Sequence, residues 1–522
     1  SNTIAAILAQ QVRQIGVMKA IGARGEQVAV LYGGLVLAYG VLGLLVGVPL
    51  SVVGARGLAD LNAALFNADI GSYQIPVGIF VLQAVVGLAV PVLAAVVPLL
   101  GAIRMSVREA MSSYGLSSTA PRQSRLDRTL ALLRGLARPL LLSLRNTFRR
   151  RGRTVLTLST LTLAGALFIS VMSLRAALMQ TVDDTLAFSG MDAQIEFDRP
   201  YRLSTVEQAA HGVQGLTLVE GRVFASARRV RPDESESGNI FVTAVPADTP
   251  LLHPKLILGR WLLPEDENAV VVNTDILRQD ADVTVGSEIT LKIDGRETTW
   301  HVVGMIEAVL MNVPPVPSVY MNYPYYVRAM RMPGKVNHVM VETALHDAGS
   351  QDRAARTLEE RLKAQGVRAN RRETAHEIRS RITAIFDMLV MLFSIMAILL
   401  GVVGGLGLAG TMGLSVLERT REIGVLRAIG ASNGAVRGIV VAEGLVIGLL
   451  AWLLGSVLAM PLGCFLCEQV GQSLLQMSLP LTYSIAGAGV WLLVVIVLSV
   501  VSSWAPAQSA SRLTVREVLA YE

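Results

Sequence analysis

Six long blocks with almost no charged residues constrain the fold of this chain most. They lie within residues 27–55, 70–103, 154–174, 388–417, 444–467 and 469–511. Each block holds about 20 or more mostly apolar residues, enough for one helix to cross a hydrocarbon core of roughly 30 Å. The composition, 52% hydrophobic and 16% charged over 522 residues, argues against a disordered chain or an ordinary soluble enzyme. The sequence predicts a polytopic α-helical membrane protein with about six transmembrane helices.

The charged residues are sorted by region, and this sorting predicts the orientation of the chain. Residues 176–382 have normal soluble composition and carry 23 basic and 28 acidic side chains, a net charge of −5, whereas the rest of the chain carries +11. Arginines gather in the loops within 101–153 and 418–437. Loops rich in basic residues stay in the cytoplasm, so the acidic region is expected outside. Nucleic acid is not an expected partner, because the arginine cluster adjoins a membrane helix and lacks interleaved aromatic residues.

An internal repeat at an offset of 408 residues is the most specific motif. The segment RQIGVMKAIGA at 13–23 matches REIGVLRAIGA at 421–431 at eight of 11 positions. The same offset aligns RMSVREAM at 104–111 with RLTVREVL at 512–519. Because two separate segments share one offset, the chain is read as one complete unit and part of another.

The complete unit begins near Pro139 and runs to Glu522, and the first unit begins only at its cytoplasmic loop. We therefore expect the given sequence to be an N-terminally incomplete piece of a longer permease. By the repeat period, roughly 270 residues with two helices and a second outside domain would precede it.

These motifs resemble those of the FtsX-like permease domain of type VII ABC transporters. The likeness rests on 421–431, on the closing segment ASRLTVREVL at 510–519, and on RNTFRRRGRT at 145–154. The region containing GRW at 259–261, AVVVN at 269–273 and WHVVG at 300–304 resembles the MacB-type periplasmic core domain.

The resemblance implies a domain plan with an extracytoplasmic α+β domain of the MacB type. It comprises the C-terminal part of a first FtsX-like unit with a coupling loop and two transmembrane helices, a cytoplasmic linker, a basic amphipathic helix with one transmembrane helix, a MacB-like core domain, and a second FtsX-like domain with three transmembrane helices. These five parts are expected at 1–111, 112–138, 139–180, 181–375 and 376–522.

The resemblance further implies a permease of the plasma (inner) membrane that is not itself an enzyme. It would couple ATP hydrolysis by separate cytoplasmic ABC ATPase subunits to export or extraction of a lipoprotein, lipid, peptide or drug by mechanotransmission. The chain would bind no cofactor; ATP and Mg would bind the ATPase. In agreement, the sequence contains no G-x-x-x-x-G-K-[ST] phosphate loop. Membrane lipids and an extracytoplasmic protein are further candidate partners. The alternative is a non-transporting scaffold that activates a cell-wall hydrolase or senses a ligand.

The loops at 10–24 and 418–432 are predicted to be short cytoplasmic helices. A stripe of apolar residues at helical spacing favours a coupling helix that sits in a groove of the ATPase, and the alternative is a turn that only joins two membrane helices. Gly22 and Gly430 are predicted to be helix C-caps or points of close approach. The residues predicted to contact the ATPase are Arg13, Ile15, Gly16, Lys19, Ile21, Gly22, Arg421, Glu422, Ile423, Gly424, Leu426, Arg427, Ile429 and Gly430.

Two apolar stripes predict that membrane helices project outward as a paired stalk. One stripe contains Leu174, Leu178 and Val182, and the other contains Ile378, Ile382, Ile385 and Leu389. The bland alternative is that both helices end at the membrane surface. In the outside region, strands are expected at 268–273, 288–293 and 298–303, with a hairpin turn at 294–295 and a helix at 351–366.

Several other residues suggest sites but have simpler explanations. Cys464 and Cys467 lack a second cysteine pair, so no metal site is predicted. Glu443 is expected to snorkel or to pair with Arg437. The glycines at 401–407 lie in a membrane helix and indicate close helix packing. The aromatic, proline-rich stretch at 313–326 either contacts a partner or packs on its own sheet.

Overall fold

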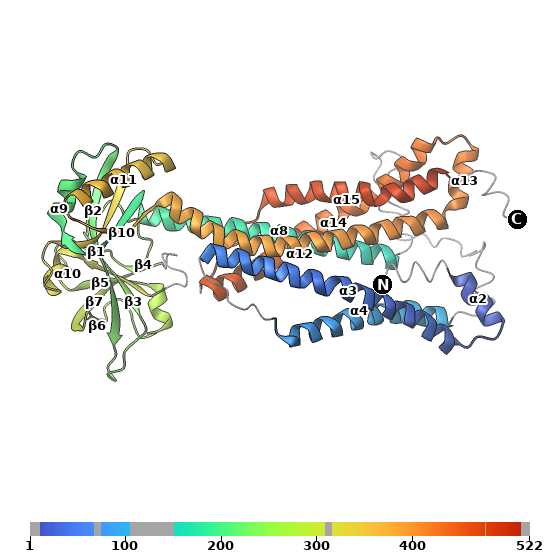
Figure 1. Cartoon of the computed structure of the whole chain (residues 1–522), viewed down its shortest axis with the longest axis horizontal. Helices are drawn as coiled ribbons and strands as arrows, with labels where there is room; N and C mark the ends of the chain where they lie inside the picture. The colour runs from blue at the N-terminus through green and yellow to red at the C-terminus, as the bar shows by residue number, and fades with distance from the viewer. Residues whose placement is uncertain (1–10, 67–74, 105–150, 308–315, 476, 513–522) are drawn as a thin grey trace. The chain divides into compact units, whose positions relative to one another are not determined.

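The computed structural model describes residues 11–66, 75–104, 151–307, 316–475 and 477–512. The chain divides into two compact units (Figure 1). The membrane unit takes in 1–169, 393–459 and 485–522, and the sheet unit takes in 170–392 and 460–484. The predicted linker at 112–138 and the start of the amphipathic helix at 139–150 lie outside the described residues.

Among the described residues, six helices are long and apolar enough to cross a membrane, as the uncharged blocks predict. The block predicted at 469–511 begins too early. Residues 471–475 form a π-helical turn, and helix resumes only at Ile485. The long helices are α3 (Gly25–Phe66), α4 (Val77–Arg104), α8 (Arg151–Ser189), α12 (Ala375–Glu418), α14 (Asn433–Val470) and α15 (Ile485–Arg512).

Small residues bring the helices of the membrane unit close together. A Cβ atom added to Gly404 of α12 would lie 2.8 Å from Leu161 of α8. A Cβ atom on Gly455 of α14 would lie 3.0 Å from the backbone oxygen of Thr162. These approaches confirm that the glycines at 401–407 serve helix packing, in which small side chains let helix backbones approach.

The sheet unit is built on a mixed, ten-stranded sheet. Its strands follow the order β10-β1-β9-β2-β3-β8-β5-β7-β4, and β6 pairs with β2 and β7. Most pairs are antiparallel, while β3–β8 and β5–β7 are parallel. The strands are β1 (Ala193–Arg202), β2 (Leu216–Val230), β3 (Ile240–Val245), β4 (Leu256–Gly259), β5 (Ala269–Asn273), β6 (Glu288–Ile293), β7 (Arg296–Ile306), β8 (Ser318–Asn322), β9 (Lys335–Thr343) and β10 (Ala369–Thr374). The unit also has the helices α9 (Leu203–Ala210), α10 (Tyr323–Ala329) and α11 (Ala348–Ala364) and the 3-10 turn η1 (Thr274–Arg278).

The predicted strands and hairpin are confirmed. Strands β5, β6 and β7 cover the three predicted segments. Asp294 and Gly295 both have positive φ, 47° and 78°, as a two-residue hairpin turn between right-twisted strands requires. The predicted helix is α11, which begins three residues earlier than expected, because Asp347 caps it by accepting a hydrogen bond from the Ser350 amide.

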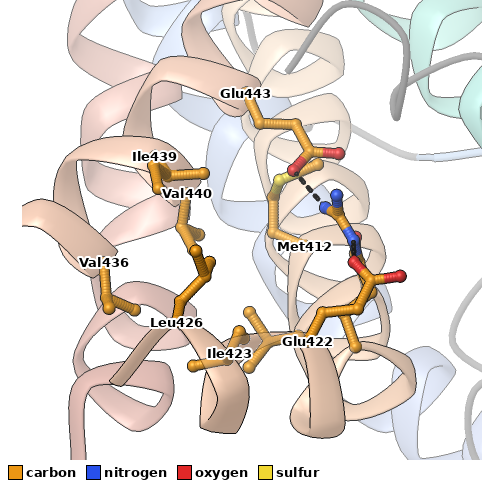
Figure 2. Close-up of a pocket in the computed structure, with 11 residues that line it drawn as sticks. Met412, Glu422, Ile423, Leu426, Val436, Ile439, Val440 and Glu443 are labelled. Atoms are coloured by element: carbon orange, nitrogen blue, oxygen red, sulfur yellow. Dashed lines mark hydrogen bonds and ion pairs between the residues drawn. The ribbon is translucent and has the colours of Figure 1, made fainter. Parts of the chain in front are cut away.

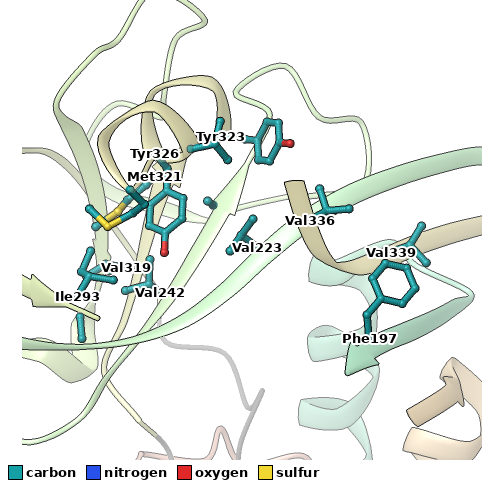
Figure 3. Close-up of a cluster of buried hydrophobic side chains, with 14 of the residues drawn as sticks. Phe197, Val223, Val242, Ile293, Val319, Met321, Tyr323, Tyr326, Val336 and Val339 are labelled. Carbon is teal, nitrogen blue, oxygen red and sulfur yellow. The ribbon is translucent and has the colours of Figure 1, made fainter. Parts of the chain in front are cut away.

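The core of the sheet unit includes the aromatic residues that follow the proline-rich stretch (Figure 3). Tyr320, Tyr323 and Tyr326 are buried, and Tyr326 packs in one cluster with Met321. In the described part of the stretch, from residue 316 onward, the alternative of packing on its own sheet is therefore the one observed. Residues 313–315 lie outside the described residues.

One half-buried histidine, His338, is expected to make the stability of the sheet unit depend on pH. The His338 ring on β9 lies against the Phe224 ring, with centroids 4.3 Å apart, and faces Glu196 on β1 and Arg222 on β2. Burial lowers the pKa of His338 to about 4, against a weaker opposing effect of Glu196. An unfolded histidine takes up its proton near pH 6.5. Between these values the unfolded chain binds more protons, so stability falls as pH drops from about 6.5 to 4, by up to about 3 kcal/mol.

His338→Gln is therefore expected to flatten the dependence of Tm on pH between about 4 and 6.5. The measurement is thermal unfolding of the detergent-solubilised chain across this range. His301→Gln, at a half-exposed histidine of β7, serves as the control and should leave the slope unchanged. An unaltered slope in His338→Gln would show that another group carries the dependence.

Candidate functional site

Two short helices occupy the two copies of the repeated motif. They are α2 (Val12–Ala20) and α13 (Thr420–Ala428), which confirms the predicted helices. Each ends in a glycine with positive φ, 102° at Gly22 and 100° at Gly430, because the chain must adopt a left-handed conformation there. The capping bonds also repeat at the 408-residue offset. The Ala23 amide donates to Met18 O at 2.9 Å, and the Ala431 amide donates to Leu426 O at 3.0 Å, which is the Schellman pattern.

Each short helix is anchored by an isoleucine that packs on the helix following it. Ile15 packs against Val28 and Tyr32 of α3. Ile423, at the same position of the repeat, packs against Val436 and Val440 of α14. The sequence repeat is therefore also a repeat of packing contacts.

The anchors divide the predicted contact residues into an inner and an outer set. Ile15, Gly16, Ile423 and Gly424 are buried, so a partner could touch them only by opening this packing. The side of each short helix that faces away from this packing carries large apolar side chains that are exposed to solvent. Ile21 is 82% exposed and Ile429 is 77% exposed. We define the outer face as Val17 and Ile21 of the first unit and Val425, Leu426 and Ile429 of the second.

The remaining predicted residues surround this outer face. Gly22, Glu422 and Gly430 are exposed, whereas Lys19 and Arg427 are half-buried. Arg13 and Arg421 lie on the helices, and their side chains fall outside the described part of the chain. Val17 and Val425 were missed by the sequence analysis, although their matching places in the repeat could have identified them.

A buried ion pair lies behind α13 (Figure 2). Arg419 lies between α12 and α13, and its Nη1 donates to Glu443 Oε2 of α14 at 3.0 Å. The same guanidinium reaches Glu422 through Nε at 3.2 Å. The expected partner of Glu443, Arg437, instead donates to the Ser511 hydroxyl at 3.0 Å. The expectation was wrong because helical periodicity ranks near neighbours on α14 and takes no account of the preceding helix.

In the sheet unit, the outer parts of α8 and α12 pack together with the segment at 460–484. Leu174, Leu178 and Val182 of α8 are all buried in one cluster with Phe386 of α12. The predicted stripe on α8 is thus confirmed. The predicted stripe on α12 is confirmed in part. Ile382 packs against the same cluster and Ile378 packs against a neighbouring one. Further along, Phe386 and Val390 are buried, whereas Ile385 and Leu389 are half-buried. Free Cys467 lies in the same cluster.

Ion pairs also join these two helices. Arg175 Nε lies 2.8 Å from Asp387 Oδ1, and Arg379 Nη2 lies 2.8 Å from Asp183 Oδ1. All four side chains are 44–52% exposed. Exposed charges of this kind are costly in hydrocarbon, which indicates that these helix segments lie in water or at the membrane interface.

The two helices enter the sheet at one joint. Strand β1 follows α8 and strand β10 precedes α12, and the two strands pair directly. Asp192, 5% exposed, lies at this joint. Its carboxylate accepts hydrogen bonds from the Thr343 amide at 2.7 Å and from the Gln351 amide group at 2.8 Å. Its carbonyl accepts from the amide of Ala375, the first residue of α12, at 2.8 Å.

Two family models match this chain. The model of the FtsX-like permease C-terminal domain matches residues 1–107 and 391–515, and the model of the MacB-like periplasmic core domain matches 154–361. The two segments of the first match contain the two copies of the motif at 13–23 and 421–431.

Relatives of known sequence cover parts of the chain. An uncharacterized ABC transporter permease of Methanocaldococcus jannaschii is 26% identical over 50% of this chain and 64% of its own length. The macrolide export ATP-binding/permease protein MacB of Burkholderia cenocepacia is 35% identical over 25% of this chain and 18% of its own length. The chain thus spans less than two thirds of these relatives.

A solved structure resembles part of the chain weakly. The periplasmic region of MacB from Actinobacillus actinomycetemcomitans is 14% identical, covering 39% of this chain and 97% of that chain, with a TM-score of 0.29. The identification of the domain rests on the family model rather than on this superposition.

Proposed function

We propose that this chain, which belongs to the ABC transporter permeases of the FtsX and MacB type, transmits force from cytoplasmic ATPase subunits to its extracytoplasmic sheet unit. The force would drive export or extraction of a lipid, lipoprotein, peptide or drug. ATP and Mg would bind the ATPase partner, since the chain has no phosphate loop of its own. The membrane would be the plasma membrane.

The observation that carries this proposal is the length of two helices. With 39 and 44 residues, α8 and α12 are about 58 and 66 Å long. A hydrocarbon core needs only about 30 Å. The excess length is rigidified by the buried cluster around Leu178 and Phe386 and ends at the joint of β1 and β10. Both helices continue without a break from the membrane unit into the sheet unit. We expect a continuous helix pair of this kind to carry motion from one end to the other, which supports mechanotransmission rather than a central channel.

The outer face of α2 and α13 is the proposed seat of the ATPase. Its exposed isoleucines and valines stand on short helices whose inner side is anchored in the membrane unit. A short helix that presents apolar side chains in this way suits a groove on a partner. Any displacement of the partner would then act on a helix that is already fixed to α3 or α14.

The combined variant Ile21→Asp and Ile429→Asp tests this seat. A carboxylate in the centre of an apolar contact is left without its water and without a partner, so we expect at least about tenfold weaker co-purification of the ATPase. The measurement is the amount of ATPase retained on the tagged, detergent-solubilised chain. The matched control is Leu345→Asp, which places the same charge at a 65% exposed leucine of the sheet unit. Undiminished retention in the double variant would remove the outer face from the interface.

A further inference from the structure

The two units of the repeat differ in how the short helix is fastened. In the second unit, the guanidinium of Arg419, which lies between α12 and α13, pairs with Glu422 in the first turn of α13 and with Glu443 of α14. The Glu443 side chain is only 6% exposed, and that of Arg419 is 23% exposed. We call these three residues the clasp.

The surroundings of the clasp make its pairing necessary. Apolar side chains, among them Met412, Val416, Ile439 and Val440, line the small cavity of about 50 Å³ beside it (Figure 2). A carboxylate in such surroundings is costly unless a cation accompanies it. Glu443 therefore ties the position of Arg419 to α14, and Arg419 ties the end of α12 to α13.

The first unit has no clasp residues at the matching positions. At the offset of 408, Arg419, Glu422 and Glu443 correspond to Gln11, Gln14 and Leu35. None of the three can form an ion pair, and Leu35 is 38% exposed. The apolar anchor is nevertheless kept in both units, as Ile15 and Ile423 show. The difference thus concerns the clasp and leaves the anchor in place.

We propose that the clasp makes the two short helices mechanically unequal, so that the ATP-driven movement reaches the α8–α12 helix pair mainly through α13. We call this helix pair the lever. Displacement of α13 is passed through Arg419 to α12, and α12 is the helix that leads to β10 of the sheet unit. Helix α2 offers a docking face without this ionic connection. The inference rests on the proposed function, because it assigns different roles to the two surfaces, on α2 and on α13, at which the ATPase would bind. Arg419 and Glu443 are positioning residues in this scheme.

The test removes the clasp from the second unit, in the complex of the full chain with its co-purifying ATPase. We call the variant that does so the clasp exchange. Arg419→Gln combined with Glu443→Leu gives the second unit two of the three matching residues of the first and removes the buried pair. Hydrogen exchange at the amides of 419–423, the elbow between α12 and α13, is expected to become about tenfold faster. The ATPase should stay bound, because the outer face is unchanged. Arg419→Gln alone should accelerate exchange more than the double variant, since it leaves Glu443 unpaired. Glu443→Gln alone, whose side-chain oxygen can still accept a hydrogen bond from Arg419, should retain most of the protection against exchange that the unmodified chain shows.

A second readout separates transmission from simple stability. Spin labels at Asp184 of α8 and Ser380 of α12, both exposed, report the distance between the outer helix segments before and after ATP addition. The clasp exchange should reduce the ATP-dependent change at least about twofold, whereas Gln11→Ala with Leu35→Ala in the first unit should leave it intact. Unchanged exchange and an unchanged distance response, with ATPase bound, would overturn the clasp. Failure of the unmodified chain to bind any ATPase would instead overturn the proposed function.

Discussion

Replacing Asp192 by alanine is expected to lower the free energy of unfolding of the sheet unit by about 3 kcal/mol or more. The carboxylate is buried and accepts hydrogen bonds from the Thr343 amide, the Thr343 hydroxyl and the Gln351 side chain at 2.7–2.9 Å. Alanine would leave the Thr343 amide without its acceptor, and an unsatisfied buried donor loses its full hydration energy. The Thr343 hydroxyl and the Gln351 side chain would each lose one acceptor and keep the Leu345 or the His346 carbonyl. Asp192→Asn should also be costly, because its amide nitrogen would face another donor.

Hydrogen exchange at the Thr343 amide and thermal unfolding of the purified chain measure this effect. The control is His346→Ala. The His346 Nδ1 atom lies 2.9 Å from Asp192 Oδ2, but its side chain is 68% exposed, so its loss should cost less than about 1 kcal/mol. Equal effects of Asp192→Ala and His346→Ala would mean that the buried donors find other acceptors.

The position of Asp192 also connects this prediction to the proposed transmission of force. The residue stands between the end of α8 and the start of β1, and its carbonyl holds the first amide of α12. Both helices of the proposed lever therefore reach the sheet within one hydrogen-bonded joint. A loosened joint should weaken the ATP-dependent response of the sheet unit while ATPase binding persists, since the outer face on α2 and α13 is unaffected.

The sequence predicted the elements whose signals are local or repeated. Charge-free blocks located the long helices, short strand-forming runs next to turn residues located β5, β6 and β7, and the motif repeat located α2 and α13 with their caps at Gly22 and Gly430. Each of these features depends on residues close together in the chain. The family match then supported the nature of the sheet unit, which short strands alone could not specify.

The sequence did not predict which side of a helix is covered, because that depends on partners far along the chain. The stripe of Ile423 and Ile429 was treated as one contact face, yet Ile423 is 8% exposed and Ile429 is 77% exposed. Glu443 was matched with Arg437, six residues away on its own helix, and the structure pairs it with Arg419 across the elbow. Such choices are made by tertiary packing, for which spacing along one helix carries no information.

The packing between α14 and α15 was also not predicted from the sequence, which pointed only to the glycines of α12 as sites of close helix packing. Gly444 and Gly448 stand one turn apart on α14, and a Cβ atom on either would overlap the hydroxyl of a serine on α15, Ser503 or Ser499. Both serines are buried. The two helices thus approach through facing rows of small residues, a contact that tolerates no added side chain.

The variant Gly444→Leu with Gly448→Leu is expected to separate α14 from α15 and to destabilise the membrane unit by several kcal/mol. Overpacking costs about 1–3 kcal/mol at each site, and both sites act on the same interface. Thermal unfolding in detergent, followed by the tryptophan fluorescence of the chain, to which Trp491 of α15 contributes, measures the loss. Gly438→Leu is the matched control, because it adds the same side chain to the same helix where a Cβ atom has no neighbour within 4 Å. If Gly438→Leu and the double variant unfold at the same temperature, helix propensity rather than close packing governs α14. A difference between them would show that the anchor of α13 stands on a helix fixed by its small residues, as force transmission through α13 requires.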